Sequence, residues 1–472
     1  EHAKIWVNEE VPAIESGFFA ILSSYYGVFF LLFLIFLIYP LYKILKRDNI
    51  SINYLYVHFL SVFFLLMFLT QSKFSYYLTL LVSINSVYIL LLILKGLSWD
   101  YMGRMDMWKH VFLIILAMSV SLGFVFSPTL YNEGIGQSTE WMNDNTPEPG
   151  IEVNNYTELA SYEQYNFTYP EESYGVMTTP DYGHWVTSEA ERIPFTNPFH
   201  RHLIEYTRYI MAQSEKDAQN SLKDANYESN KEYIIMDWGS VMNIGRLHQE
   251  RVEDSISYDV YEEVGDKVYL RNQNHYNSLQ LKLYLYHGSN FSSQLGGFGI
   301  YPYSPVESLD NYRYIYGSNE SVTPRHTRLR EKIIRENTNH TNIKSEDFIP
   351  MSSSYAKVFE RVPGADIEGS GVPPESQIII ETELMEPNNN ETFYYKQVTR
   401  ADKKGHFNLT VPYSTVGYNK WGPEYGYSNP QVHAVSDYNI YSNGNLMGEV
   451  DVPESKIIGI NNSSIKLNYG EK

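Results

Sequence analysis

A few charged side chains in this 472-residue chain stand where they could do chemistry. Glu9 precedes the first apolar run, Lys73 lies in a tight turn between two apolar runs, and Asp181 opens an Asp-Tyr-Gly turn. A carboxylate can accept a hydrogen bond or bind a hard cation. A lysine at the end of an apolar hairpin either extends toward water or meets an anion. Taken singly, each residue also fits an ordinary loop or turn.

The composition excludes several other kinds of site. The chain has no cysteine, which excludes disulfides, zinc-thiolate sites and thiol catalysis. Its formal charge of -19 comes without a concentrated basic patch, so nucleic acid is not an expected partner. Histidines such as His58, His184 and His340 lack metal-ligand spacing, and the glycine-rich run 296–299 lacks the strand-to-helix context of a phosphate-binding loop.

The first part of the chain is dominated by Phe, Leu, Ile and Tyr. Its apolar runs cover residues 17–42, 54–70, 74–94 and 110–128. The first run is long enough to cross a bilayer core of about 30 Å. Clusters of Lys and Arg follow the first run and separate the last two, which places these loops in the cytoplasm. We therefore expect a four-helix transmembrane region over residues 17–128, with residues 1–16 and 129–472 on the extracytoplasmic side.

The polar remainder predicts two further domains. A helical stretch over residues 202–225 leads to an apolar strand over 233–236, which indicates an extracytoplasmic α/β core over residues 129–352. Alternating strands follow, with turns at Asp402–Gly405 and Asn443-Gly444. Those strands are predicted over residues 377–384, 393–399 and 407–411. This pattern favours a carboxy-terminal β-sandwich over residues 353–472.

Several segments share their pattern with one protein family. The segment Thr179-Pro180-Asp181-Tyr182-Gly183-His184-Trp185 resembles the WWDYG region of oligosaccharyltransferases. Residues 6–9 resemble the TIxE motif of their long external loop, and residues 70–77 resemble a turn that usually carries Arg at the place of Lys73. Residues 361–371 and 407–427 resemble the β domain of haloarchaeal members. Over essentially its whole length the chain is similar to the carboxy-terminal part of the catalytic subunit of archaeal oligosaccharyltransferases.

The resemblance implies a glycosyltransferase in the cell membrane. The family moves a glycan from a dolichyl phosphate or pyrophosphate carrier to Asn of Asn-X-Ser/Thr in acceptor proteins, with Mn²⁺ or Mg²⁺. An amide nitrogen is a poor nucleophile because its lone pair is delocalised, so carboxylates must engage its N–H groups. By resemblance, Glu9 has this catalytic role and binds the metal, while Lys73 binds the lipid phosphate. Asp181 accepts a hydrogen bond from the acceptor hydroxyl, with Thr179 and Tyr182 beside it.

Other features depart from the family or remain open. Ile244 fits a wall of the acceptor pocket or a core residue. Thr179 and Pro180 replace two tryptophans; either acceptor choice is relaxed, or the chain is a non-catalytic, membrane-anchored surface paralogue that binds glycans or envelope proteins. The family's amino-terminal catalytic aspartate and DxD motif have no counterpart here, so we do not expect the chain to act alone. Candidate self-acceptor sequons on the external side include Asn155, Asn166, Asn290, Asn319, Asn339, Asn390, Asn408, Asn461 and Asn462.

Overall fold

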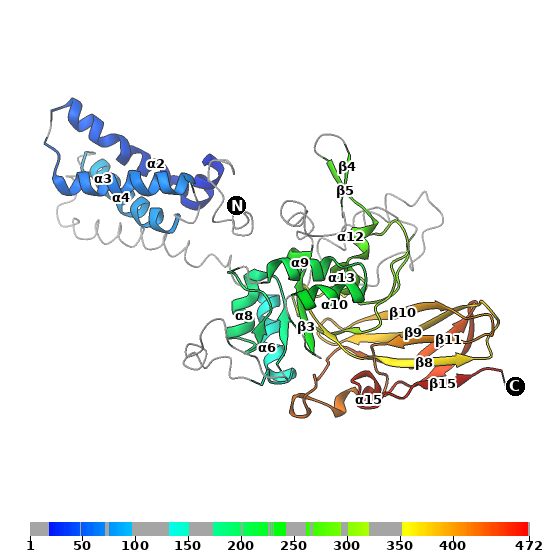
Figure 1. Ribbon diagram of the computed structural model, residues 1–472. Helices are drawn as coiled ribbons and strands as arrows, with labels where there is room; N and C mark the ends of the chain where they lie inside the picture. The colour runs from blue at the N-terminus through cyan, green and yellow to red at the C-terminus, as the bar shows by residue number, and fades with distance from the viewer. Residues whose placement is uncertain are drawn as a thin grey trace. The chain divides into compact units, whose positions relative to one another are not determined.

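The computed structural model of the protein contains two compact units, residues 1–130 and 131–472 (Figure 1). The residues that it describes are 18–47, 49–70, 75–96, 132–150, 173–199, 202–224, 227, 229, 231–241, 261–264, 268–293, 301–320 and 352–470.

Three helices form the described part of the first unit. They are α2 (Phe18–Leu45), α3 (Ile52–Thr70) and α4 (Ser75–Gly96). They share a small apolar cluster, and between α3 and α4 the buried amide of Asn85 donates to the hydroxyl of Ser61 at 2.7 Å. Buried polar groups in apolar surroundings need such partners. Helices therefore occupy three of the four predicted apolar runs.

The predicted membrane crossings are not settled by these helices. Among the residues that the structure describes, no helix has both the length and the hydropathy needed to cross a bilayer. The fourth predicted run, residues 110–128, lies outside the described residues. The four crossings stay a prediction.

A five-stranded mixed sheet organises the core of the second unit, in the order β2-β1-β3-β7-β6. Its strands are β1 (Gly175–Met177), β2 (Ile193–Pro194), β3 (Glu232–Asp237), β6 (Tyr312–Gly317) and β7 (Ala356–Arg361). β1 runs parallel to β2 and β3, whereas β7 runs antiparallel to β3 and β6. All of β3 is buried, as expected for a strand covered on both faces. The predicted strand 233–236 is confirmed and is one residue longer at each end.

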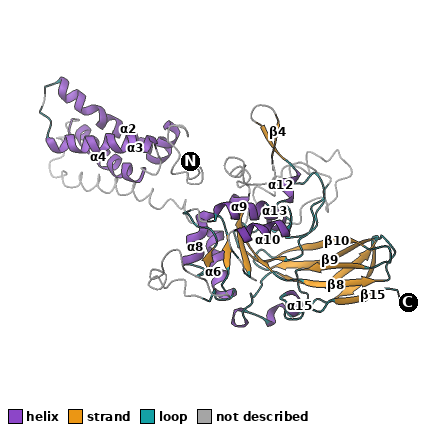
Figure 2. Ribbon diagram, viewed as in Figure 1, coloured by secondary structure: helices purple, strands orange, loops and turns teal. Residues whose placement is uncertain are grey.

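Helices cover both faces of this sheet (Figure 2). Tyr233 and Ile235 of β3 pack with α6 (Glu133–Asn145) and α8 (Gly183–Ser188). Ile234 and Met236 face the other way. The helices on that second face are α9 (Leu203–Met211), α10 (Glu215–Asp224), α12 (Gln273–Asn277) and α13 (Leu279–Tyr284), with the hairpin β4 (Tyr261–Val264) and β5 (Val268–Arg271) preceding α12. The predicted α/β core is confirmed.

The prediction of a single helix over residues 202–225 is wrong, because the helix is interrupted between α9 and α10. Ala212 has an extended backbone, and its carbonyl accepts the N–H of Leu279 at the start of α13 at 2.8 Å. The hydroxyl of Ser214 then accepts the N–H of Asp217 at 3.1 Å, which caps the start of α10. A hydrogen bond to a distant segment thus overrides the local helical pattern.

Arg192 fixes the end of α6 against the segment that follows α8. Its side chain is 0% exposed. The guanidinium donates to the carbonyl oxygens of Asn143 and Thr146 at 3.0 and 2.7 Å, and to the Thr146 hydroxyl at 3.0 Å. It also donates to the carbonyl of Ala190 at 3.1 Å. The last carbonyls of a helix lack partners within it and carry a partial negative charge, so a cation here satisfies both demands.

The carboxy-terminal domain consists of two sheets that form a β-sandwich. One sheet has the order β10-β9-β13-β14, with β12 paired to β9, and the other has the order β11-β8-β15. The strands are β8 (Ala365–Ser370), β9 (Gln377–Glu386), β10 (Glu391–Arg400), β11 (Phe407–Val411), β12 (His433–Ala434), β13 (Tyr438–Ser442), β14 (Asn445–Val450) and β15 (Ile465–Asn468). Short helical segments are η6 (Tyr418–Lys420), η7 (Pro423–Tyr425) and α15 (Glu454–Ile457).

The predicted strands of this domain are confirmed. Asn443 and Gly444 join β13 to β14 with positive φ values of 47° and 82°, as a type I′ turn requires. β7, in contrast, belongs to the core sheet. The sandwich therefore begins at β8, after the predicted limit at residue 353.

A buried ion-pair network joins the core sheet to the β domain. Arg313 of β6 lies 2.8 Å from Glu360 of β7 and 2.8 Å from Glu454 of α15. All three side chains are buried. Removing one partner would leave a buried charge uncompensated, which is costly. The network therefore holds α15 to the edge of the core.

Lys357 of β7 is a further buried basic residue, and no carboxylate of the described residues is in direct contact with it. Its ammonium donates to the carbonyls of Tyr284 and Ser352, both at 3.0 Å, and lies 3.1 Å from Nε2 of His287. The ammonium also lies 4.4 Å from the centre of the Tyr284 ring. Burial lowers the pKa of Lys357 to about 7.

We predict that Arg192→Lys lowers the free energy of unfolding by about 2 to 4 kcal/mol, because a single ammonium cannot replace the guanidinium hydrogen bonds. Urea unfolding of the purified chain measures the change. Arg400, at the end of β10, is exposed, so Arg400→Lys should change the value by less than about 0.5 kcal/mol. Equal effects of the two variants would contradict the role assigned to Arg192.

We also predict a pH dependence that Lys357 causes. Its pKa is lower in the folded than in the unfolded chain, so the unfolded chain binds more protons above about pH 7. Stability should therefore rise between about pH 7.5 and 9.5, by about 1 kcal/mol per pH unit. Lys357→Met should remove this rise in urea unfolding curves, and the exposed Lys420→Met should keep it. An unchanged slope in Lys357→Met would show that other groups cause it.

Candidate functional site

The Asp181 turn directly follows the carboxyl end of β1. The turn is a short 3-10 segment, η3 (Pro180–Tyr182), and Thr179 precedes it with an extended backbone. Proline fits the first helical position because its φ is fixed there and its missing N–H is not needed. The Thr-Pro pair therefore starts the turn, and Asp181 lies exposed within it.

Gly183 lets another segment pack directly against this turn. A Cβ at Gly183 would lie 2.4 Å from the carbonyl oxygen of Thr196 and 2.7 Å from Cα of Asn197. The Thr196 hydroxyl donates to the carbonyl of Thr178 at 2.6 Å. Any larger residue at position 183 would push this segment away, so the glycine is needed for close approach.

Tyr182 links the turn to the start of α6. Its hydroxyl accepts a hydrogen bond from the amide of Asn132 at 2.9 Å. The other end of that amide, Oδ1, accepts the N–H of Ile135 at 3.2 Å and so caps α6. Burial, and then the charge of Asp237, raise the pKa of Tyr182 above its usual value. The Tyr182 hydroxyl therefore stays protonated at neutral pH.

Asp237 ends the neighbouring strand β3. Since β1 and β3 are parallel, their carboxyl ends meet at one edge of the sheet, where α/β folds place ligands. Asp237 is 1% exposed and accepts both the N–H of Ser240, at 3.1 Å, and the Ser240 hydroxyl. It also bonds to Tyr355, whose pKa is raised to about 12 by burial and then by the Asp237 charge. The Asp237 side chain is thus part of the buried structure at this edge, whereas the Asp181 side chain is exposed there.

The hydrogen-bonding groups of the turn suit a small hydroxyl ligand. Asp181 is a carboxylate acceptor at the surface. Beside it, the hydroxyl of Thr179 is buried and has no hydrogen-bond partner within the described residues. A buried hydroxyl without a partner is unfavourable, and a ligand that hydrogen-bonds to it would remove that cost.

The structure describes only part of the predicted site. Thr179, Asp181 and Tyr182 lie in or directly before one turn, and Asp237 ends the neighbouring strand β3. Glu9, Lys73 and Ile244 lie outside the described residues, so their catalytic, metal, lipid-phosphate and pocket roles stay predictions. Across the described ranges, no group of three or more His, Asp or Glu side chains could hold a metal ion.

Sequence reasoning missed Asn132 and Tyr355, which complete this edge. Asn132 directly precedes α6, and an Asn at that place could have been recognised as a helix cap. Its contact with Tyr182 spans 50 positions and has no local signal. Tyr355 precedes β7, whose pairing with β3 brings it to Asp237.

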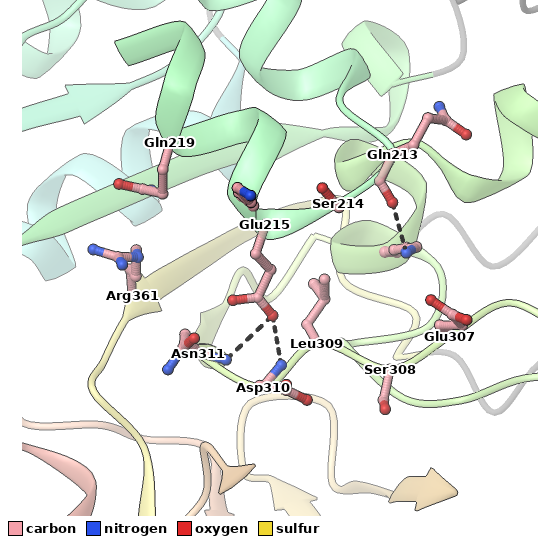
Figure 3. A pocket seen from close by; sticks show the side chains of 12 residues that line it. Gln213, Ser214, Glu215, Gln219, Glu307, Ser308, Leu309, Asp310, Asn311 and Arg361 are labelled. Carbon is pink, nitrogen blue, oxygen red and sulfur yellow. Dashed lines mark hydrogen bonds between the residues drawn. The ribbon is translucent and has the colours of Figure 1, made fainter. Parts of the chain in front are cut away.

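A separate cleft lies at the opposite end of β3, because Glu232 pairs with Arg361 and Asp237 pairs with Ala356. The cleft has a volume of about 430 Å³, and Arg361 and Glu215 line it (Figure 3). Glu215 accepts the N–H groups of Asp310 and Asn311, at 2.5 and 3.3 Å. Burial raises the pKa of Glu215 to about 7. The cleft is not part of the Asp181 site.

The chain matches two models of archaeal glycosylation proteins. Residues 133–259 match the AglB core domain, and residues 364–463 match the Archaeal glycosylation protein B long peripheral domain. These ranges contain the Asp181 turn and most of the β-sandwich, respectively.

Whole-chain comparisons point to the same proteins. The chain is 28% identical to the dolichyl-monophosphooligosaccharide-protein glycotransferase AglB of Haloferax volcanii, over 78% of this chain and 44% of the relative. A solved structure of Archaeoglobus fulgidus AglB, in complex with an inhibitory peptide and a dolichol-phosphate, has a TM-score of 0.59 and 20% identity, and the match covers 94% of this chain and 56% of that one.

A further structure of the Archaeoglobus fulgidus oligosaccharyltransferase, tethered to an acceptor peptide with an NVT sequon, has a TM-score of 0.60 and 20% identity. That match covers 94% of this chain and 57% of that one. The chain spans less than half the length of the curated relatives it matches. In sequence and in two of its domains the chain is thus similar to archaeal oligosaccharyltransferases of the AglB type, and it shares their fold.

Proposed function

We propose that this chain is part of an oligosaccharyltransferase that moves a glycan from a dolichyl phosphate or pyrophosphate carrier to Asn of Asn-X-Ser/Thr. The observation that carries the proposal is the exposed Asp181, held in a rigid turn at the edge where β1 and β3 end. The names of the relatives support it, since the Haloferax volcanii protein is a glycotransferase and one structural match holds an NVT-sequon peptide.

The turn would recognise the hydroxyl two residues after the acceptor asparagine. Asp181 accepts the hydrogen bond from that hydroxyl, and the Thr179 hydroxyl, which no described residue hydrogen-bonds, supplies a second contact. Tyr182 keeps the turn against Asn132, and Ile244 forms an apolar wall. A site that hydrogen-bonds a hydroxyl rejects peptides without one far better than an apolar pocket does.

Activation of the acceptor amide is assigned to Glu9. Its carboxylate accepts an N–H of the acceptor asparagine, which weakens conjugation of the nitrogen lone pair with the carbonyl. A carboxylate is also a hard oxygen ligand that suits Mn²⁺ or Mg²⁺, so Glu9 would hold one position of a bound divalent cation. Such a cation neutralises negative charge on a departing phosphate.

Lys73 is assigned to the phosphate of the lipid carrier. The related turn usually carries Arg, which binds phosphate through two parallel hydrogen bonds. Lysine binds as a point charge on a flexible stem, so its grip on the carrier is weaker.

We further propose that the helices of the first unit lie in the cell membrane and that the core and β-sandwich are extracytoplasmic. The outer faces of α2 and α3 carry exposed apolar side chains, such as Leu45 at 84% and Phe59 at 66%. Such faces are unfavourable in water and match lipid chains. Residues 110–128 would form the fourth crossing.

A non-catalytic surface paralogue is the second candidate. The presence of Thr179 and Pro180 in place of two tryptophans favours it, because aromatic contacts to the acceptor are lost. The presence of Glu9, Lys73 and Asp181 in segments that resemble the family's motifs disfavours the non-catalytic paralogue. The two candidates differ in one outcome: only the enzyme transfers glycan.

We predict that Asp181→Ala, which removes the acceptor, lowers transfer of glycan to an Asn-X-Thr peptide by about 10- to 150-fold, because a hydrogen bond to a charged group contributes about 1.5 to 3 kcal/mol. Full-length protein in membranes, supplied with the lipid-linked glycan and Mn²⁺ or Mg²⁺, provides the assay. Asp144→Ala is the control, since Asp144 is an exposed acid on α6. Transfer at an equal rate by both variants would reject Asp181 as the hydroxyl-reading residue.

For Lys73 we predict opposite effects of two substitutions. Lys73→Arg should lower the KM for the lipid-linked glycan several-fold, because the guanidinium forms two hydrogen bonds to phosphate. Lys73→Met should raise that KM. Initial rates at varied carrier concentration measure both, and an unchanged KM in both variants would favour a lysine that only extends to water.

A further inference from the structure

Several of the sequons named above lie within the described residues and differ in how their side chains are used. A transferase has to reach the acceptor amide and also read the hydroxyl two positions later. Asn155, Asn166, Asn339 and the hydroxyl residue of the Asn319 sequon, Ser321, lie outside the described residues. The remaining sequons can be compared by exposure and hydrogen bonding at both positions.

The sequon at Asn390 leaves both positions accessible. Asn390 ends the turn between β9 and β10 and is exposed. Thr392, two residues later in β10, is also exposed. Neither side chain forms a hydrogen bond within the described residues, whereas the backbone N–H of Asn390 closes the turn to the carbonyl of Pro387 at 3.2 Å. The acceptor amide and the hydroxyl are therefore both free at the tip of a hairpin.

Neighbouring side chains hold this hairpin tip in place. The amide of Asn388 donates to the carbonyl of Gly317 at 2.6 Å, and the amide of Asn389 donates to the hydroxyl of Ser354 at 2.7 Å. Of the three consecutive asparagines, two thus use their amides inside the protein. Asn390 alone keeps its amide at the surface, on a firmly anchored turn.

Other sequons are engaged by their own surroundings. Asn408 lies within β11, paired to Glu368 of β8, and its sequon hydroxyl, on Thr410, donates to the carboxylate of Asp366 at 2.6 Å. The carbonyl of the Asn461 side chain accepts both the N–H and the hydroxyl of Ser463, at 3.0 and 2.7 Å. Binding to an enzyme would have to break these bonds first.

Two further sequons are less accessible than Asn390 at one position. Asn290 is half-buried, and its backbone N–H is bound to the carbonyl of Lys396 at 2.7 Å. The sequon of Asn462 ends at Ser464, which is half-buried. The hydroxyl residue of the Asn319 sequon is Ser321, so that sequon is not described in full. Among the sequons with both positions described, Asn390 is thus the one whose amide and hydroxyl are both exposed and unbonded within the described residues.

We propose that Asn390 is an N-glycosylation site of this protein, with a lipid phosphate-linked glycan as the donor. A bond forms between Nδ2 of Asn390 and the anomeric carbon of the glycan. The bond from that carbon to the phosphate oxygen breaks, the phosphate leaves with the electron pair, and the amide loses one proton. The inference rests on the proposed function, because a sequon-specific transferase in the same membrane has to catalyse this step.

A conformational explanation for Asn390 competes with this proposal. The residue has φ of 51°, a left-handed conformation that asparagine tolerates better than most residues. That explanation requires only the backbone of Asn390 and makes no use of Thr392. Substitutions at Thr392 therefore separate the two explanations without touching the turn.

Glycopeptide mass spectrometry of the full-length protein, purified from the membranes of its own cells, tests the proposal. We expect a glycan on Asn390 in the wild type and in Thr392→Ser, and its loss in Thr392→Val, which keeps the branched side chain but lacks the hydroxyl. Asn390→Gly should keep the turn and lose the glycan. Asn408→Gln, at a sequon engaged within a strand, should leave the glycan on Asn390 unchanged.

As a control, the same cells should also express a secreted reporter protein with one exposed Asn-X-Thr sequon. A glycosylated reporter together with unmodified Asn390 overturns this inference and leaves the proposed function standing. An unmodified reporter and unmodified Asn390 overturn both. A glycan on Asn390 that persists in Thr392→Val also overturns the inference, because the modification would not depend on the sequon.

Discussion

The candidate site depends on one interaction: the buried guanidinium of Arg192 donates hydrogen bonds to the carbonyls at the end of α6. A fully buried charge is stable only when its donors are satisfied, and here carbonyls of α6 and of the segment after α8 satisfy them. This fixes one end of α6. At the other end, Asn132 caps the same helix and holds the Tyr182 hydroxyl. Because both ends of α6 are fixed, Asn132 holds the Asp181 turn in one position.

The sheet provides a second constraint on the same turn. Because β1 and β3 are parallel, the turn after β1 and Asp237 at the end of β3 lie at one edge. Asp237 is buried and bonds to Ser240 and Tyr355, whereas Asp181 is exposed at this edge. Gly183 allows the Thr196 segment to close the turn from behind. A rigid, exposed acceptor of hydrogen bonds suits recognition of one hydroxyl better than catalysis of a reaction by itself.

Local sequence patterns predicted the secondary-structure elements that depend only on neighbouring residues. Alternation of apolar residues predicted β9, β10 and β11, the Asn443-Gly444 pair predicted its hairpin, and an apolar run predicted β3. The break after α9 could not be predicted, because it depends on a hydrogen bond from Leu279 to Ala212 across the fold. The Asp181 turn could be predicted from its motif. Asn132 and Tyr355 could not be assigned to that turn, because their contacts at the same edge of the sheet also join segments that are distant in the sequence. The roles of Glu9, Lys73 and Ile244 rest on the resemblance alone.

The central claim is that the Asp181 turn reads the hydroxyl of an Asn-X-Ser/Thr acceptor. Calorimetric titration of the full-length protein with matched Asn-X-Thr and Asn-X-Val peptides tests it most directly, since the two peptides have the same shape and differ in that hydroxyl. The account predicts that the valine peptide binds at least about tenfold more weakly, and that Asp181→Ala removes the difference. Equal affinity of the wild-type protein for both peptides would contradict the account.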